Sequence, residues 1–310
     1  MTATAWVFPG QGSQIVGMGK ALAEKYPEVA ELYAEADRVL GFSLSTLCFQ
    51  GPEEELTRTD NAQPAILVTS LAHLAVLQHY FPDSLGDTPP LYLAGHSLGE
   101  YTALVASGAL DFSNAVRLVH QRGLLMNDVS KDDHGQPNTG MVAVLGGNDA
   151  LLEELARQTG TEVANYNSPG QIAISGTYEA LARFTEAAKS KGIKRVIPLS
   201  VSAAFHSSLM RPMAEKLGHM IVATDFKAAH TPVVSNVTAQ SLPLNDALAL
   251  KLELTTQTYS PVRWVESVVT MYAGGATRFI EIGPGKVLAG LIKRIEKSAE
   301  TLNSETIIGA

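Results

Sequence analysis

The most informative part of the chain is residues 91–108, with the sequence LYLAGHSLGEYTALVASG. Its apolar start, residues 91–94, predicts a short strand, and residues 100–106 predict a helix. The segment Gly95-His96-Ser97-Leu98-Gly99 must turn sharply between the two, which glycine allows because it has no Cβ to clash. A G-x-S-x-G sequence between a strand and a helix is typical of a nucleophile elbow. Ser97 is therefore a candidate nucleophile; the alternative is a serine that only caps the helix.

The composition of the whole chain narrows the class of protein. Its 310 residues, 45% hydrophobic and 17% charged, are typical of a globular protein with one large domain or two smaller ones. The formal net charge of −8 disfavours nucleic acid or an anionic membrane as a partner. The N-terminus has no basic, apolar leader, and the most apolar run, residues 65–77, is too short to span a bilayer.

Cysteine and histidine patterns bear on redox compartment and metals. Cys48 is the single cysteine, which excludes an internal disulfide and predicts a cytoplasmic location. Neither C-x-x-C nor H-E-x-x-H occurs, so no metal site is predicted.

A second turn rich in glycine follows a predicted strand at residues 5–8. The loop Pro9-Gly10-Gln11-Gly12-Ser13-Gln14 matches neither a dinucleotide fingerprint nor a P-loop. By itself it is equally compatible with an anion site and with a plain turn. It gains interest beside Ser97, because a nucleophile elbow needs a second oxyanion donor from another strand-to-helix loop.

The predicted helix at residues 112–129, capped by Asp111, carries two arginines on opposite faces. At 100° per residue, Arg122 lies in the middle of the apolar arc, whereas Arg117 lies on the polar side. A buried guanidinium needs a carboxylate or phosphate partner. The partner is either an internal Asp or Glu or a carboxylate of the substrate, and spacing alone leaves both open.

The middle of the chain has a different pattern from its flanks. Residues 130–140 predict a linker, and the elements after it follow in the order βαββαβ, which is the ferredoxin-like unit. The expected strands are 141–145, 162–167, 171–175 and 194–199, with helices at 149–158 and 177–191. We therefore expect a small subdomain, 140–200, inserted into a large α/β subdomain, 1–139 and 201–310, with a mostly parallel sheet. In the large subdomain we further expect a loop at 81–90, a strand at 232–238 and a helix at 261–272.

A base for Ser97 must come from the eight histidines. His206 is the best placed, because it follows the point where the chain re-enters the large subdomain. His96 is adjacent to Ser97, but neighbouring side chains diverge, so a supporting role is expected for it. The residues by themselves leave the identity of the base open.

The chain as a whole resembles the malonyl-CoA:acyl-carrier-protein transacylase family. Seven segments carry the resemblance in the family's order: FPGQGSQ at 8–14, GHSLGEY at 95–101, QRGLLM at 121–126, NSPGQ at 167–171, AFHS at 204–207, QTYSPVRW at 257–264 and EIGPGKVL at 281–288. The family has an α/β-hydrolase-like core with an inserted ferredoxin-like subdomain, which is the fold class that the pattern predicts.

The resemblance implies catalytic roles. Ser97 would be the acylated nucleophile and His206 its base, oriented by a backbone carbonyl near Gln257 in place of an aspartate. The backbone N–H groups of Gln11 and Leu98 would form the oxyanion hole.

The resemblance also implies how the substrate is bound. Arg122 would hold the free carboxylate of a malonyl group, and Gln63 and Asn167 match polar family positions near the pocket. Phe205 resembles the residue beside the histidine in malonyl-selective acyltransferases, where it would fill the space of an α-methyl group.

The function that the resemblance implies is transfer of malonyl from malonyl-CoA, through a serine ester, to the phosphopantetheine thiol of an acyl carrier protein. The carrier is free-standing or a domain of a polyketide synthase, and the pathway is fatty-acid or polyketide biosynthesis. No cofactor is permanently bound, and a monomer is expected. The alternatives are an acyl hydrolase that clears carrier proteins, disfavoured by Arg122, and a non-catalytic docking module, disfavoured by intact Ser97 and His206.

Overall fold

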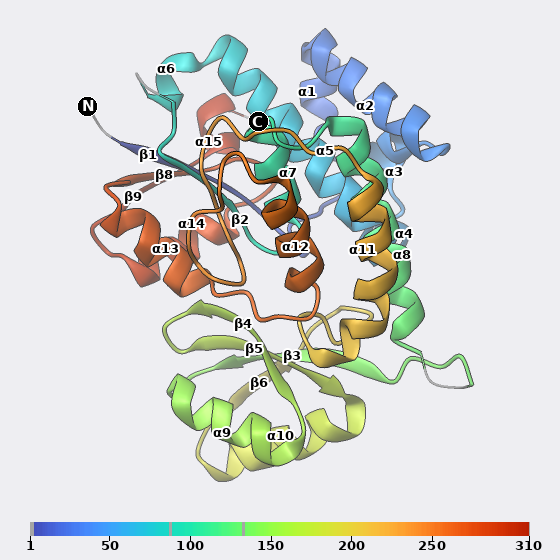
Figure 1. Ribbon diagram of the computed structural model, residues 1–310, viewed down its shortest axis with the longest axis vertical. Coiled ribbons are helices and arrows are strands. Elements are labelled where there is room, and N and C mark those ends of the chain that lie inside the picture. Colours follow the sequence, from blue (N-terminus) through green and yellow to red (C-terminus); the bar gives the residue numbers. More distant parts are fainter. Residues whose placement is uncertain (1–2, 87–88, 132–133, 310) are drawn as a thin grey trace.

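The structure is a computed structural model that describes residues 3–86, 89–131 and 134–309. Within these residues two sheets form, one parallel and one antiparallel, and Figure 1 shows the antiparallel sheet below the larger helical body. The parallel sheet has the order β7-β2-β1-β8-β9, and every neighbouring pair in it is parallel. Its strands are β1 (Thr4–Phe8), β2 (Tyr92–Gly95), β7 (Val233–Val234), β8 (Arg278–Glu281) and β9 (Glu300–Asn303).

Both faces of the parallel sheet are covered. Side chains alternate along a strand, and in β1 Trp6 and Phe8 belong to one apolar cluster while Ala5 and Val7 belong to another. This double burial is why β1 is apolar from Ala5 to Phe8 rather than alternating with polar residues.

The helices that do not belong to the ferredoxin-like unit are α1 (Lys20–Lys25), α2 (Pro27–Leu40), α3 (Leu44–Gln50), α4 (Glu53–Thr57), α5 (Thr59–Tyr80), α6 (Pro82–Leu85), α7 (Gly99–Ala106), α8 (Phe112–Val129), α11 (Arg211–Ala223), α12 (Ala247–Gln257), α13 (Trp264–Ala273), α14 (Val287–Ile295) and α15 (Ser304–Ile308), with a 3₁₀ turn at Ser208–Met210.

The antiparallel sheet has the order β4-β5-β3-β6, the strand order of a ferredoxin-like unit. Its elements are β3 (Thr139–Leu145), α9 (Asp149–Thr159), β4 (Glu162–Ser168), β5 (Gln171–Thr177), α10 (Tyr178–Ser190) and β6 (Arg195–Pro198). A separate apolar cluster, drawn only from residues 142–193, lies between this sheet and its two helices. The predicted fold class, an α/β-hydrolase-like core with an inserted ferredoxin-like unit, is confirmed.

Helix α5 is buried along most of its length, with apolar residues on all sides. It contains Pro64, which has no N–H to donate to the carbonyl of Asp60. The Nδ1 atom of His120 on α8 lies 2.9 Å from that carbonyl and takes up its free acceptor. This contact between α5 and α8 therefore replaces the hydrogen bond that Pro64 cannot donate, so the helix continues through the proline from Thr59.

Three local expectations were wrong. The segment 81–90, expected as a loop, contains the short helix α6. The expected helix at 261–272 begins only at Trp264, because Val262 forms backbone hydrogen bonds with Ala164 and Tyr166 and is held extended. The expected strand at 232–238 is limited to β7, because Ser235 accepts hydrogen bonds from the following backbone and turns the chain. A membrane-spanning helix is not found in the part of the chain that the structure describes.

Candidate active site

Ser97 lies at the turn between β2 and α7, with a φ of 52°, in the left-handed region that favours glycine. The flanking glycines leave no room for a side chain. A Cβ on Gly95 would lie 1.8 Å from the carbonyl carbon of Gly99, and one on Gly99 would lie 2.1 Å from the carbonyl oxygen of Phe8. The turn is therefore as sharp as the G-x-S-x-G pattern predicts, and it brings Ser97 to the carboxyl end of the parallel sheet.

His206 lies beside Ser97 and is joined to it. The distance between Ser97 Oγ and His206 Nε2 is 2.7 Å. The other ring nitrogen, Nδ1, lies 2.9 Å from the carbonyl oxygen of Gln257 and 3.1 Å from that of Ser260. Because a carbonyl can only accept, Nδ1 carries the proton and Nε2 is free to accept one from the serine. No carboxylate is needed to orient this histidine.

Burial keeps His206 neutral. Desolvation, together with the nearby Arg122 charge, lowers the pKa of His206 to about 3. A neutral imidazole can take the hydroxyl proton at any pH near neutrality, as a general base requires.

Arg122 on α8 is only 2% exposed, and its guanidinium is directed at Ser97. Its guanidinium donates to Gln63 Oε1 at 2.7 Å, to Gln257 Oε1 at 3.1 Å and to Ser97 Oγ at 3.1 Å. Among the described residues no carboxylate forms an ion pair with Arg122, and its Nε has no hydrogen-bond partner. The internal salt bridge that the sequence left open is therefore not formed. A buried cation without a counter-charge, beside a nucleophile, suits an anionic ligand.

The first glycine-rich loop packs against the elbow. A Cβ on Gly10 would lie 2.5 Å from the carbonyl oxygen of His96, so the loop and the turn are in backbone contact. The side chain of Gln11 donates to Thr59 Oγ1 at 3.2 Å. The backbone N–H groups of Gln11 and Leu98 form no hydrogen bond with any residue that the structure describes. These two donors remain available for an oxyanion.

A cavity of about 260 Å³ lies beside this loop and is lined by the antiparallel sheet and α14. His96 and Asn167 both line it, and His96 Nε2 lies 2.8 Å from Asn167 Oδ1. Leu288 and Leu291 of α14 give it an apolar wall. Phe205 does not line this cavity; its side chain is 7% exposed within the main apolar cluster, and its carbonyl oxygen accepts a 2.5 Å hydrogen bond from Ser175 Oγ.

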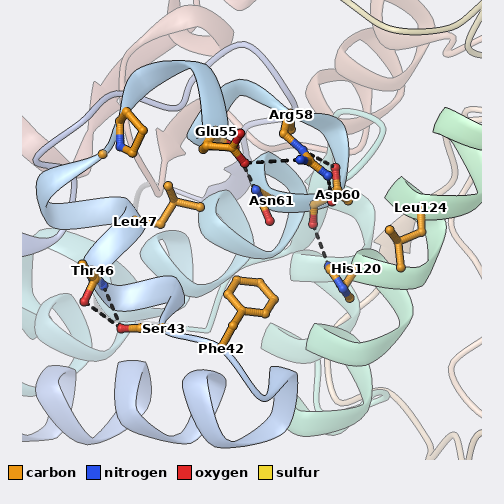
Figure 2. Close-up of a pocket in the computed structure, with 12 residues that line it drawn as sticks. Phe42, Ser43, Thr46, Leu47, Glu55, Arg58, Asp60, Asn61, His120 and Leu124 are labelled. Carbon is orange, nitrogen blue, oxygen red and sulfur yellow. Dashed lines mark hydrogen bonds and ion pairs between the residues drawn. The ribbon is translucent and has the colours of Figure 1, made fainter.

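A second hollow, of about 580 Å³, lies on another face of α5 and α8 and contains none of the predicted site residues. Figure 2 shows Arg58 bonded to Glu55 and Asp60 at one end of it, and His120 directed at Asp60. Its polar groups thus bind one another. No cluster of three or more metal-ligating side chains occurs among the described residues.

Sequence reasoning missed three residues at this site. Asn236 accepts the backbone N–H of Ser97 through Oδ1 at 2.7 Å, and Ser260 supplies the second carbonyl to His206. Glu100 is fully buried beneath Ser97, and burial together with the neighbouring Glu253 raises the pKa of its carboxyl group. Asn236 lies two residues after the end of β7, where the ends of parallel strands meet at one edge of the sheet, but the strand expected at 232–238 placed it inside a strand.

Comparisons with known proteins agree with this geometry. The acyl transferase domain model matches residues 5–310. A malonyl CoA-acyl carrier protein transacylase of Bacillus subtilis is 47% identical over 307 residues, which are 97% of this chain and 93% of the relative. An acyl carrier protein S-malonyltransferase from Vibrio cholerae has a TM-score of 0.90 at 42% identity, over 97% of this chain and 96% of the other.

A further solved structure includes a partner protein. It is a malonyl-transacylase in complex with a type II PKS acyl-carrier protein, with a TM-score of 0.91 at 39% identity, over 100% of this chain and 99% of the other. The domain model covers nearly the whole chain, and the relatives match it end to end. The chain therefore belongs to the family of proteins built on the acyl transferase domain.

Proposed function

We propose that this protein transfers a malonyl group from malonyl-CoA, through an ester on Ser97, to the phosphopantetheine thiol of an acyl carrier protein. The observation that carries the proposal is the buried, unpaired guanidinium of Arg122, 3.1 Å from Ser97 Oγ. An acyl group bound as an ester at Ser97 and ending in a carboxylate would supply the missing counter-charge. The names of the relatives, malonyl transacylases of acyl carrier proteins, support the same substrates.

The first half-reaction forms the acyl-enzyme. His206 Nε2 takes the proton of Ser97 Oγ, and the oxygen attacks the thioester carbonyl of malonyl-CoA. The N–H groups of Gln11 and Leu98 hold the negative oxygen of the tetrahedral intermediate. The C–S bond then breaks, His206 returns the proton to the sulfur, and CoA leaves as the free thiol.

The second half-reaction repeats these steps with the carrier protein. Its phosphopantetheine thiol gives a proton to His206, and the sulfur attacks the ester carbonyl at Ser97. The C–O bond breaks, and Ser97 recovers its proton from His206. No redox or metal step enters, and the phosphopantetheine arm belongs to the carrier.

The remaining predicted residues take supporting roles in this proposal. Gln63 and Gln257 orient Arg122, and the Gln257 carbonyl orients His206. Asn167 holds His96 beside the cavity through which the thiol arm passes. Phe205 limits the room for a branched acyl group.

Several broader features complete the proposal. The chain divides into a large subdomain, 1–139 and 201–310, and a small one, 140–200, a division that the apolar cluster within residues 142–193 supports. Met141, Ala164 and Ala173 of the small subdomain belong to the main apolar cluster. Its free thiol, Cys48, supports a cytoplasmic location, and we expect a monomer. The hydrolase alternative gains no support from the relatives described above, which are named as transferases or transacylases.

The test is intact-protein mass spectrometry after incubation with malonyl-CoA, followed by addition of a holo acyl carrier protein. A malonyl adduct on Ser97 that passes to the carrier is expected. Loss of the adduct to water at the same rate with and without the carrier would contradict transfer and favour hydrolysis. Acetyl-CoA, which lacks the carboxylate, serves as the comparison substrate.

A further inference from the structure

Glu100 is a fully buried acid in the first turn of α7, three residues after the nucleophile. Among the described residues it forms no ion pair with a lysine or arginine. Its two oxygens are both engaged: Oε1 accepts the backbone N–H of Asn236 at 3.1 Å, and Oε2 accepts Nε2 of Gln257 at 2.5 Å. A buried acid is costly, so contacts of this kind point to a specific task.

The two residues that Glu100 binds both hold the backbone of Ser97. Asn236 Oδ1 accepts the Ser97 N–H at 2.7 Å, and Gln257 Nε2 donates to the Ser97 carbonyl at 2.8 Å. A left-handed φ costs a residue other than glycine of the order of 1–3 kcal/mol and persists only when its surroundings enforce it. Glu100 thus binds the two residues, Asn236 and Gln257, whose hydrogen bonds hold Ser97 at a φ of 52°.

Glu100 also determines which way the Gln257 amide faces. Both hydrogens of Nε2 are used, one by Glu100 and one by the Ser97 carbonyl. The amide oxygen is therefore turned to the other side, where it accepts from Arg122 at 3.1 Å. If the amide were reversed, an NH₂ group would face the guanidinium, and two donors would oppose each other.

We propose that Glu100 is a positioning residue that acts through Gln257 and Asn236 to orient both Ser97 and Arg122, and so contributes to the preference for acyl groups that end in a carboxylate. The inference rests on the proposed malonyl transfer. It assigns Glu100 no contact with the substrate. An oxygen of a carboxyl group accepts a hydrogen bond whether or not the group is protonated, whereas an amide NH₂ cannot, so Glu100→Gln is the informative change.

The experiment compares kcat/KM for acylation of the enzyme by malonyl-CoA and by acetyl-CoA. In Glu100→Gln, Gln257 reverses its amide, and we expect kcat/KM for malonyl-CoA to fall about 100-fold but that for acetyl-CoA only about 10-fold. The malonyl-to-acetyl ratio thus falls about tenfold. The matched control is Glu281→Gln, a buried acid at the end of β8 that also accepts two hydrogen bonds, both from backbone N–H groups, and should leave the ratio within about twofold.

A second variant keeps the test decisive if Glu100→Gln does not fold. Gln257→Leu leaves Glu100 and the Gln257 carbonyl in place but cuts the link to Arg122, and it should lower the ratio about as much. The double variant should have the same malonyl-to-acetyl ratio as Gln257→Leu alone, because the link from Glu100 to Arg122 passes through Gln257. Equal losses for the two substrates in either folded variant overturn the inference. Failure of the wild-type protein to form a malonyl adduct would instead overturn the proposed function.

Discussion

Two turns at the carboxyl end of the parallel sheet each join a strand to a helix, but they differ in which residues have a positive φ and in whether their polar groups have partners. The first joins β2 to α7 and carries Ser97, and the second joins β8 to α14 through Gly283-Pro284-Gly285. In the second turn, glycines take the positive φ values, 142° at Gly283 and 81° at Gly285. In the first, a serine does so, held by Asn236 and Gln257.

The helix N-termini differ in the same way. Glu281 accepts the N–H groups of Leu288 and Ala289 at 3.1 and 2.8 Å, so the start of α14 already has its own carboxyl group. At the first turn the Leu98 N–H has no partner among the described residues. The buried Arg122 nearby also has no ion-pair partner among the described residues. The second turn binds its helix N–H groups with its own carboxyl group, Glu281, whereas the first turn leaves the Leu98 N–H available for a ligand.

The largest effect on activity is expected for Ser97→Gly, which places a glycine at the positive φ of the first turn, as in the second turn. Acylation by malonyl-CoA should fall by about 10⁴- to 10⁶-fold, because the nucleophile is gone. Unfolding in urea should show the Gly variant to be more stable than Ser97→Ala by about 1 kcal/mol, since only glycine has the left-handed φ without strain. Both variants lose the same Oγ contacts, so an Ala variant as stable as the Gly variant would contradict strain at this turn.

The next effect comes from removing the unpaired cation. In Arg122→Ala we expect kcat/KM for malonyl-CoA to fall about 100- to 1,000-fold, because a buried charged hydrogen bond to the substrate is lost. Acetyl-CoA should be affected much less. Arg278→Ala is the control, because its exposed pair with Glu300 contributes at most about 1 kcal/mol and touches no substrate. Parallel losses for the two acyl donors would argue against a carboxylate-binding role.

Glu281, at the second turn, should make the free energy of unfolding depend on pH. Burial raises the pKa of Glu281 from 4.5 to about 7. The native state therefore prefers the protonated form, so the stabilisation is fully present below pH 4.5 and is lost as pH rises through 7. Between pH 5 and pH 8 the loss is about 2–3 kcal/mol.

The measurement is urea unfolding of the wild type and Glu281→Gln at both pH values. The wild type should lose about 2–3 kcal/mol more than the variant over this interval. His206 and the other titrating groups are present in both proteins, so their contributions cancel in the difference. A constant difference between the two proteins would show that Glu281 titrates as it does in the unfolded chain.

The smallest expected effect concerns the shape of the open site. If Phe205 fills the room that an α-methyl group needs, Phe205→Ser should raise the ratio of methylmalonyl-CoA to malonyl-CoA acylation by about 1–3 kcal/mol, or about 5- to 150-fold. Phe205→Leu keeps most of the bulk and is the control. Because Phe205 is buried, near-ultraviolet circular dichroism should first establish that each variant is folded. An unchanged ratio in a folded Ser variant would remove Phe205 from substrate selection.

Local patterns predicted well whatever a short segment determines by itself. The G-x-S-x-G turn, the apolar face that carries Arg122 and the βαββαβ order all follow from residues within a few turns or strands of one another. The failures had one distant cause and one local cause. The start of α13 at Trp264 depends on backbone bonds to β4, whereas β7 is short because Ser235 Oγ accepts hydrogen bonds from the backbone two and three residues after it.

The sequence by itself therefore determined the elements, the fold class, the nucleophile turn and the burial of Arg122. It left open whether Arg122 has an internal partner, which histidine faces Ser97, and what holds a serine at a positive φ. Tertiary structure decided these points, because the groups involved are far apart in the chain: His206 is 109 residues from Ser97, and Asn236 is 139. Hydrogen bonds of this kind require exact distance and direction, and periodicity along the chain carries no information about either.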